Sequence, residues 1–393
     1  MKILVLSSST GGGHDMRARS FEQWAHAGPA VAPAVSVQRR QCLDNDGALY
    51  AFGSWLYNFI QKTWPVLHHI YFNVLEVVPF CTSAAALPHR AQFQGAIREI
   101  APDIVLSTHD HLNHAYLEAA RAAIAGAGGD SRRRPPLCGT YCGELSGGYG
   151  FSRRWVNPNA DFFIGAVDDC VAEARRHGMP AEKSWTGGFV LNPDFWDPPL
   201  TAEKRAAFMR ENLRLDPDRF TLLLGTGANG ANNHLSLLKA LHDAGVRPQV
   251  IALCGRNDRT RNIIEAWAAS HPGMPVAALG YQAHMRRVME CSDALFARPG
   301  TGTTSEAIQC GLPVLFNGIG GVMPQELISV RYCRRFFEAN VARSAHALPP
   351  LVEAWMRSPG RLEAVRKGLA AARPPAGLNP AEILRKLASL RDA

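Results

Sequence analysis

The sequence predicts an α/β protein built from two Rossmann-like domains. Its 393 residues are enough for two domains with complete cores. In both halves, short apolar runs typical of strands are followed by glycine-rich loops and then by helix-forming runs, which is the order of parallel βαβ units. A stretch with Pro193 and Pro198 indicates a linker. We therefore expect a first domain at residues 1–197, a second at 198–377 and a final helical segment at 378–393.

The composition indicates a globular protein without a membrane-spanning helix. Hydrophobic residues make up 47% of the chain and charged residues 19%, which is typical of a globular protein. No apolar run reaches the roughly 18 residues of a membrane-spanning helix. The apolar start of the chain stops at Ser7 and does not form a secretory signal. The nine cysteines form no C-x-x-C pair, so we expect reduced thiols and a cytoplasmic location.

The positive charge of the chain is concentrated in its second half. The net charge is +8, and residues 198–393 hold 25 Lys and Arg against 16 Asp and Glu. Such a balance suits a diphosphate ligand, and nucleic acid is the usual rival explanation. The sequence contains no basic helix, zinc finger or aromatic RNA-binding motif, so we expect no nucleic-acid partner.

The first apolar run, at residues 2–7, leads into a loop with three consecutive glycines and then a helix. Gly12 and Gly13 allow the backbone to come close to a ligand, although the spacing is neither G-x-G-x-x-G nor a P-loop. His14 lies at the start of the helix, where the helix dipole disfavours the imidazolium cation. A neutral imidazole can serve as a general base. The alternative is a histidine that only caps the turn.

Aromatic residues crowd the segment at residues 49–80, in two helix-length pieces broken at Pro65. A segment with many aromatic residues and few charges can lie at a membrane interface or line an apolar acceptor site. Such stripes are more often ordinary core, and both interpretations stay open. Among the aromatic residues of the two pieces are Trp55, Tyr57, Phe59, Trp64, Tyr71 and Phe72.

Two further strands of the first half end in polar residues. Residues 102–108 lead to the HDH sequence at 109–111. Its spacing lacks the H-E-x-x-H pattern of zinc sites, so we favour the rim of a cleft over a metal site. Residues 137–141 lead to Glu144, a carboxylate that could assist His14 or bind an acceptor hydroxyl.

The most informative pattern begins with a short apolar strand at residues 293–297. Gly300 and Gly302 follow it, and a helix is expected from near Thr303. Ligands collect at the carboxyl ends of parallel strands, and the free N–H groups of a helix N-terminus bind diphosphate. Glu306, one turn into the helix, could accept hydrogen bonds from a ribose diol. The alternative is a structural loop with a surface glutamate, and the pattern alone does not separate the two.

Two other strands of the second half precede candidate ligand-binding residues. Residues 220–225 lead into another glycine loop at 226–230. Residues 249–254 lead to Arg256, which suits a phosphate, although a surface salt bridge is the alternative.

These motifs resemble a known group of enzymes. The sequence ARPGTGTTSEAIQCGLPVLFN followed by PQE, together with STGGGH and CGRN, is similar to the nucleotide-sugar glycosyltransferases of the GT-B fold. The resemblance is greatest to the monogalactosyl- and glucosyl-diacylglycerol synthases. The lipid-linked N-acetylglucosaminyltransferase of peptidoglycan synthesis is a more distant relative. The resemblance implies a GT-B fold and a UDP-sugar as co-substrate. Because no acidic pair that resembles D-x-D lies next to the candidate diphosphate loops, we expect neither a metal nor another cofactor.

The resemblance also implies a donor site in the second domain. Glu306 would hold the uridine ribose, the loop before it would lie along the diphosphate, and Gln325 and Glu326 would touch the sugar. The uracil would lie against Tyr281. The donor-binding candidates are Thr226, Gly227, Asn229, Arg256, Tyr281, Gly300, Thr301, Gly302, Thr303, Thr304, Glu306, Met323, Gln325 and Glu326.

On the acceptor side, the resemblance makes His14 the general base. Glu144 is the second catalytic candidate, and Gly12, Gly13 and His109 are assigned to acceptor binding. The relatives usually carry threonine and aspartate where this chain has glycine and Glu144. They also carry an arginine near the position of Asn192, so one phosphate or acceptor contact is missing here. In the GT-B fold the final helix packs back toward the first domain.

We therefore predict a UDP-sugar-dependent hexosyltransferase. Its acceptor would be a hydroxyl of a diacylglycerol-like lipid or of another apolar molecule. Peripheral contact of residues 49–80 with the inner face of a membrane stays open beside a role in the core. The alternatives are a UDP-sugar epimerase of the same fold, a natural-product glycosyltransferase, and a non-catalytic protein that binds UDP-sugar or membrane. The sugar itself is not predicted, because Met323, Gln325 and Glu326 are too generic to select one.

Overall fold

The structure is a computed structural model of the 393-residue chain. It describes residues 1–8, 12–27, 35–42, 53, 55, 56, 59, 60, 63, 65–77, 83–87, 89–125, 134–225 and 233–392. The chain forms two compact units. The first unit comprises Met1–Gln61, Leu67–Pro193 and Pro374–Ala393, and the second comprises Lys62–Val66 and Asp194–Arg373.

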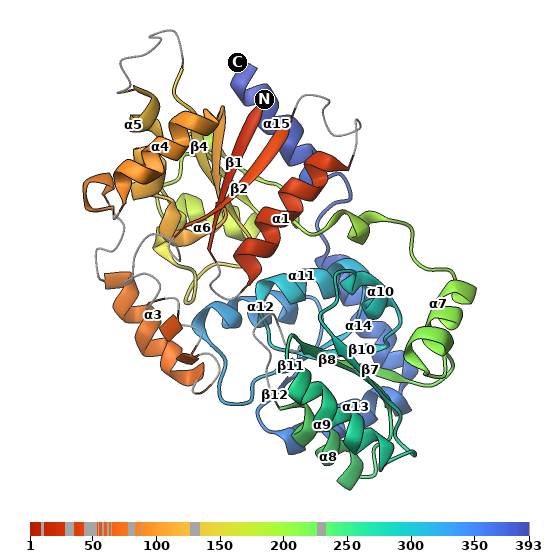
Figure 1. Ribbon diagram of the computed structural model, residues 1–393. Helices are drawn as coiled ribbons and strands as arrows, with labels where there is room; N and C mark the ends of the chain where they lie inside the picture. The colour runs from red at the N-terminus through yellow and green to blue at the C-terminus, as the bar shows by residue number, and fades with distance from the viewer. Residues whose placement is uncertain are drawn as a thin grey trace. The chain divides into compact units, whose positions relative to one another are not determined.

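Each unit contains a six-stranded parallel sheet with helices beside it (Figure 1). The α/β class and the two Rossmann-like units predicted from the sequence are therefore confirmed. The change of unit falls between Pro193 and Asp194, while the sequence analysis places the domain boundary at residue 197.

The sheet of the first unit has the strand order β2-β1-β3-β4-β5-β6. Its strands are β1 (Lys2–Ser7), β2 (Ser36–Gln41), β3 (Ile104–Ser107), β4 (Leu137–Cys142), β5 (Phe162–Gly165) and β6 (Ser184–Thr186). Most of these strands are continuous apolar runs that are buried along their length, as expected of a parallel sheet covered on both faces. The α-helices of this unit are α1 (Gly13–His26), α3 (His68–Val77), α4 (Arg90–Ile100), α5 (Ala115–Ala125), α6 (Asp168–Arg176) and α15 (Pro380–Asp392).

The strand order of the first unit creates a topological switch point between β1 and β3. After β1 the chain crosses to β2 on one side, and it later returns to β3 on the other side. Loops that leave neighbouring strands in opposite directions open a crevice at the carboxyl ends of those strands. The loop that leads to α1 and the loop that follows β3 leave the sheet at this point. A ligand site of the first unit is therefore expected between them.

The sheet of the second unit has the strand order β12-β11-β10-β7-β8-β9. Its strands are β7 (Thr221–Leu224), β8 (Gln249–Gly255), β9 (Val276–Gly280), β10 (Ala294–Ala297), β11 (Val314–Asn317) and β12 (Val341–Ala342). The α-helices are α7 (Ala202–Phe208), α8 (His234–Asp243), α9 (Asp258–Ala269), α10 (Met285–Glu290), α11 (Thr301–Cys310), α12 (Pro324–Arg334), α13 (Leu348–Arg357) and α14 (Pro359–Ala372). The switch point of this sheet lies between β7 and β10, so the carboxyl ends of these two strands are neighbours.

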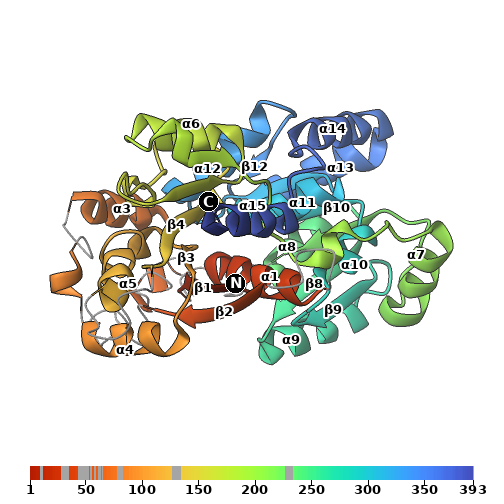
Figure 2. The ribbon, with the colours of Figure 1, turned by 90° about the horizontal axis from the view of Figure 1, so that it is seen from above.

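The C-terminal helix α15 belongs to the first unit. It lies beside α1 in both ribbon views (Figures 1 and 2). The ammonium group of Lys386 lies 4.1 Å from the centre of the Trp185 ring, and Arg391 Nη1 donates a 2.9 Å hydrogen bond to the carbonyl of Pro135. These contacts hold α15 against the unit that also contains the N-terminal strand β1.

Among the described residues, no helix combines the length and the apolar character that are needed to span a bilayer.

Candidate active site

His14 is held at the switch point of the first sheet. Gly12 adopts a left-handed conformation with φ of 75° and precedes the helix α1, so the chain turns sharply and presents His14 in the first turn. The imidazole Nδ1 lies 2.7 Å from the carbonyl oxygen of Thr108, the residue that follows β3. A carbonyl oxygen can only accept, so Nδ1 carries the proton. In the neutral ring Nε2 then holds a free lone pair.

The surroundings of His14 favour the neutral imidazole. Burial lowers the pKa of His14 well below its usual value of 6.5, and the charges of His109 and Arg17 act in the same direction. The His109 ring centre lies 4.3 Å from that of His14. His14 is therefore unprotonated at neutral pH, which is the state that a general base requires.

Asp110 organises the histidines that follow β3. Its Oδ1 accepts a hydrogen bond from the backbone N–H of His111 and lies 3.0 Å from His109 Nδ1. Burial alone would raise the pKa of the Asp110 carboxyl, but the imidazoles of His111 and His109 hold it well below its usual range. Burial also lowers the pKa of His111 to about 4. Within the described ranges, no group of three or more His, Cys, Asp or Glu side chains could hold a metal ion.

Glu144 lies in the loop that follows β4 and is almost fully buried. Burial raises the pKa of the Glu144 carboxyl to about 7 against the opposing charge of Arg17. Its Oε2 atom is buried and has no hydrogen-bond partner in the part of the chain that the structure describes. Such an atom is costly unless a ligand or water supplies a donor.

Arg17 is a site residue that the sequence analysis missed. It is buried, and its Nη2 donates a 3.1 Å hydrogen bond to the carbonyl of Gly143. A Cβ at Gly143 would lie 2.1 Å from Arg17 Nε, so a larger residue there would displace the Arg17 side chain. The sequence does hold a signal for Arg17. It lies three positions after His14 in the expected helix, and residues with this spacing share one face of a helix.

The donor candidates of the second unit begin with the N-terminus of α11. The helix starts at Thr301, two residues before the predicted start, because the extended Gly300 serves as the N-cap. No side chain caps this end, and a Cβ at Gly300 would meet nothing within 4 Å. The first N–H groups of an α-helix have no partner within the helix, and such an end suits a diphosphate. Glu306 lies in the second turn and is half-buried.

Glu326 has a structural role that the sequence analysis did not foresee. Its carboxylate accepts hydrogen bonds from Arg298 Nε at 2.7 Å, from Arg298 Nη2, and from the backbone N–H of Met323 at 2.9 Å. The last of these bonds caps the first turn of α12. Arg298 also donates to the carbonyl oxygens of Ile319 and Gly321. The contact of Glu326 with a sugar, which the resemblance implies, stays a prediction.

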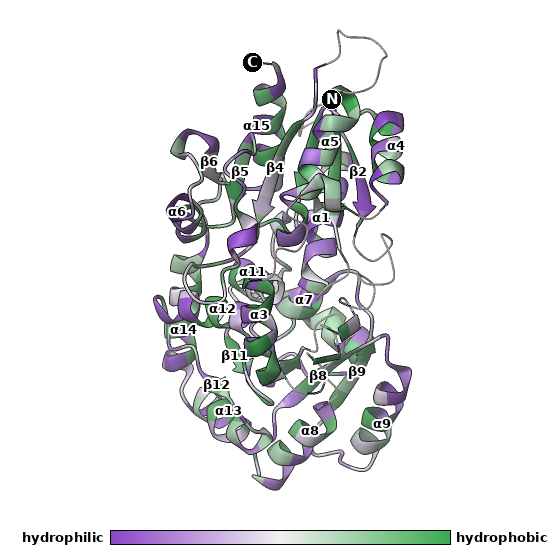
Figure 3. Ribbon diagram, turned by 90° about the vertical axis from the view of Figure 1, so that its left-hand side faces the viewer, coloured by the Kyte–Doolittle hydropathy of each residue, from purple (hydrophilic) through white to green (hydrophobic). Residues whose placement is uncertain are grey.

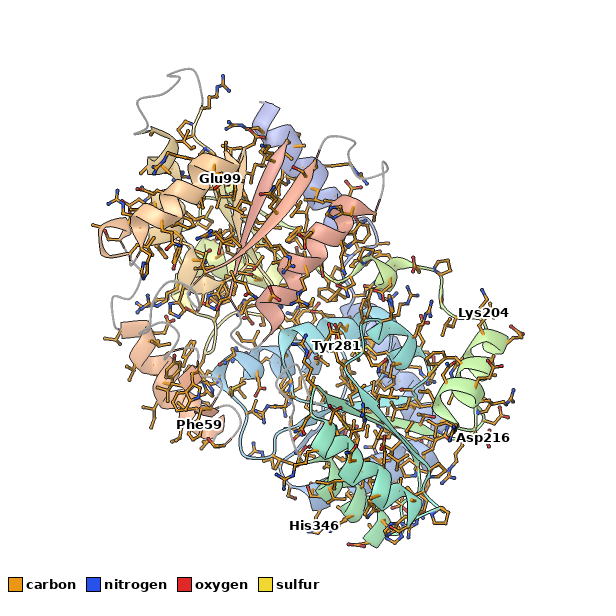
Figure 4. The ribbon with its side chains drawn as sticks, in the orientation of Figure 1. Phe59, Glu99, Lys204, Asp216, Tyr281 and His346 are labelled. Carbon is orange, nitrogen blue, oxygen red and sulfur yellow. The ribbon has the colours of Figure 1, made fainter. Side chains whose placement is uncertain are left out.

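Arg256 and Tyr281 come together at the carboxyl ends of β8 and β9. The Arg256 Cζ atom lies 5.2 Å from the centre of the Tyr281 ring, which is a cation–π distance. The Tyr281 side chain, labelled in Figure 4, is 58% exposed. An exposed ring beside a guanidinium offers a flat surface for a base and a donor for a phosphate oxygen.

The remaining predicted residues belong to both units. Gly12 and Gly13 lie directly before His14 in the first unit. Met323 is buried as the N-cap of α12, and Gln325, two residues later, is half-buried. The candidates Thr226, Gly227 and Asn229 lie outside the described residues.

Two Rossmann-like units in one chain, each with a six-stranded parallel sheet, are the architecture of the GT-B fold. The structure of Anabaena HepE in complex with UDP-glucose shares it, with a TM-score of 0.55 and 13% identity over 100% of this chain and 99% of its own. At that identity the likeness shows the fold alone, and it confirms the predicted GT-B architecture. No protein-family model matches the chain.

The chain is similar in sequence to two kinds of glycosyltransferase that act on diacylglycerol by name. The processive diacylglycerol beta-glucosyltransferase of Staphylococcus saprophyticus is 25% identical over 229 residues, which cover 58% of this chain and 56% of the relative. The monogalactosyldiacylglycerol synthase 1 of Arabidopsis thaliana is 22% identical over 380 residues, which cover 90% of this chain and 64% of the relative. The chain spans about half the length of the Staphylococcus relatives it matches. The predicted resemblance to diacylglycerol glycosyltransferases is confirmed.

Proposed function

We propose that the chain transfers a hexose from a UDP-sugar to a hydroxyl of a diacylglycerol-like lipid, with His14 as the general base. The observation that carries the proposal is the hydrogen bond from His14 Nδ1 to the Thr108 carbonyl. This bond fixes the tautomer and leaves Nε2 basic at a switch point, where ligands of such folds bind. The lipid acceptor rests on the similarity to proteins named for diacylglycerol.

The proposed reaction is a single displacement at the anomeric carbon. The acceptor oxygen forms a bond to this carbon as the bond to the UDP oxygen breaks, and the hydroxyl proton passes to His14 Nε2. The hydrogen bond from Nδ1 to Thr108 stays in place and stabilises the imidazolium. The N-terminus of α11 and Arg256 meet the negative charge of the departing UDP. We propose that the reaction needs neither a metal nor another cofactor.

Glu144 is proposed to bind the acceptor. Its buried Oε2 lacks a partner among the described residues and is therefore available to an acceptor hydroxyl. Arg17 contacts the preceding glycine and keeps the loop in place. Glu144 thus orients the hydroxyl, while His14 removes its proton.

The lipid surface is proposed to meet α3. Ile70, Val74 and Val77 of α3 are exposed and recur at the i, i+4 and i+7 positions that share one helix face, and the exposed Leu67 directly precedes the helix. Figure 3 shows hydrophobic residues along this helix. An exposed apolar helix face that lies in the plane of the interface is typical of peripheral membrane proteins. The described cysteines are free thiols, and we place the protein on the cytoplasmic face of the membrane.

The Glu306→Ala variant tests the donor seat. A carboxylate that accepts hydrogen bonds from a ribose diol contributes about 1.5–3 kcal/mol, so UDP affinity should fall by roughly 10- to 150-fold. Isothermal titration calorimetry measures this change. Glu353→Ala, on the exposed surface of α13, is the control and should bind UDP like the parent. Unchanged affinity in a folded Glu306→Ala variant removes Glu306 from the donor site.

The pH profile of turnover distinguishes the roles of the two catalytic candidates. Protonation inactivates a general base, so activity falls as the pH drops through its pKa. Because the pKa of His14 lies well below 6.5, activity limited by His14 should persist below pH 6.5. If turnover instead required ionised Glu144, it would already fall near the Glu144 pKa of about 7. We expect the first profile in kcat measured from pH 5 to 9.

Isotope-labelled UDP-sugars test the function directly. The purified protein is incubated with labelled UDP-glucose, UDP-galactose and UDP-N-acetylglucosamine, each with diacylglycerol in vesicles. A labelled glycolipid supports the proposal. An epimerised nucleotide would favour the isomerase alternative, and UDP-sugar binding without any product would favour a non-catalytic role.

A further inference from the structure

The C-terminal turn of α3 is hydrogen-bonded to the segment that follows β4. The carboxylate of Glu76, in the last turn of α3, accepts a 2.5 Å hydrogen bond from the Ser152 hydroxyl. It also accepts from the backbone N–H of Arg153 at 3.1 Å and from Arg153 Nε at 3.3 Å. The Glu76 side chain is only 14% exposed, so water competes little for these bonds.

The backbone of the same turn is held by two arginines. Arg153 Nη2 donates a 2.7 Å hydrogen bond to the carbonyl of Glu76, and Arg154 Nη2 donates to the carbonyl of Leu75. Carbonyl groups in the last turn of a helix have no partner within the helix, and cations there also face the negative end of the helix dipole. Glu76 is thus the centre of a clamp between α3 and the short helix η4 (Arg153–Trp155).

The other end of η4 lies against the candidate base. Trp155 is buried, and its ring centre lies 5.8 Å from that of His14. Asn113, just after the histidine loop, donates from Nδ2 to the carbonyl oxygens of Arg154 and Trp155. The charge of Arg154 helps burial to lower the pKa values of His111 and His114. The three residues of η4 therefore contact both α3 and the histidine site.

We propose that Glu76 is a positioning residue that couples lipid contact at α3 to the arrangement of His14. The inference rests on the proposed function and concerns its regulation. The exposed apolar face of α3 binds a lipid surface. Because the Glu76 clamp joins α3 to η4, a movement of α3 on binding also moves η4. Trp155 then shifts against the His14 ring and sets the direction of Nε2. A small error in that direction costs a large part of the rate, because catalysis depends on alignment.

The experiment compares the parent with Glu76→Gln in three assays. The first is co-sedimentation with vesicles of phosphatidylcholine and phosphatidylglycerol in equal parts. The second is kcat with diacylglycerol in these vesicles and with a monodisperse short-chain diacylglycerol without vesicles. The third is hydrogen exchange of residues 108–114 and 152–156, with and without vesicles. Glu22→Gln, which loses an ion pair with Arg39 elsewhere in the first unit, is the matched control.

We expect Glu76→Gln to sediment like the parent, because it does not alter the apolar face. Its kcat on vesicles should fall by about tenfold, while kcat on the short-chain acceptor stays within twofold of the parent. The vesicle-induced change in hydrogen exchange at both peptides should be lost. Glu22→Gln should behave like the parent throughout, and Ile70→Ser/Val74→Ser should lose sedimentation itself.

Two results would overturn the coupling. One is a Glu76→Gln variant that keeps its stimulation by vesicles and its exchange response. The other is an equal loss of kcat on both acceptors, which shows that Glu76 only supports the fold. If Glu76→Gln does not fold, Arg153→Ala breaks part of the same clamp and should show the same selective loss to a smaller degree. If the parent transfers no sugar, the proposed function fails, and the exchange assay still tests the coupling by itself.

Discussion

Replacement of His14 by alanine is expected to lower sugar transfer by about 10²–10⁴-fold, which is the usual contribution of a general base. A lipid hydroxyl is a poor nucleophile at neutral pH, so its proton must leave as the new bond forms. The variant loses Nε2, while the Thr108 carbonyl loses only a donor that water can replace. The measurement is kcat for transfer to diacylglycerol, with product quantified by mass spectrometry.

UDP affinity should be unchanged in His14→Ala, because the donor candidates lie on the second unit. His26→Ala is the matched control, since His26 lies in the last turn of α1 and its Nδ1 also contacts a carbonyl, that of Glu22 at 2.7 Å. It should keep full activity. Turnover of His14→Ala within a few-fold of the parent would rule out the proposed role, and Glu144 and His109 would become the candidates for the base.

The fold was predictable because its signals are local. A strand, a glycine loop and a helix follow one another within about 15 residues, and each step depends on the conformational preferences of a few neighbours. The candidate positions of His14 and of the α11 N-terminus come from this pattern. The strand orders, and with them the switch points, depend on pairing between distant segments, and no local pattern records that pairing.

The tautomer of His14 could not be predicted for the same reason. Its partner Thr108 is 94 positions away in the sequence and becomes a neighbour only because β1 pairs with β3. From the sequence alone, Arg17 is indistinguishable from a surface residue of an amphipathic helix. Its contact with Gly143 joins residues that are 126 positions apart. Trp155 likewise joins the site only through tertiary packing.

Within residues 298–326, one residue that the resemblance assigns to the ligand has a structural role. The resemblance assigns Glu326 to the donor sugar, while the structure occupies its carboxylate with Arg298 and Met323. A buried carboxylate needs such donors, because an unpaired charge inside a protein is costly. Arg298 directly precedes the Pro299–Gly300 loop, so this ion pair lies next to the loop that the resemblance assigns to the diphosphate.

Replacement of Arg298 by methionine should therefore destabilise the second unit by about 3–5 kcal/mol, the usual cost of removing one partner of a buried ion pair. Glu326 is 2% exposed and would keep only the backbone N–H of Met323 as a donor. The carbonyl oxygens of Ile319 and Gly321 would lose their donors as well. Urea unfolding monitored by circular dichroism measures the change, and the transition of the second unit is identified by its stabilisation with UDP.

Two controls separate the buried charge from the loss of side-chain packing. Arg357→Met removes an exposed ion pair with Glu353 in the same unit and should cost no more than about 1 kcal/mol. Arg298→Met/Glu326→Leu removes both charges and should regain most of the lost stability, because an apolar pair can replace a buried ion pair at little cost. An Arg298→Met variant that is as stable as Arg357→Met would show that Glu326 does not depend on this partner. Its carboxylate would then be free to serve the donor sugar, as the resemblance implies.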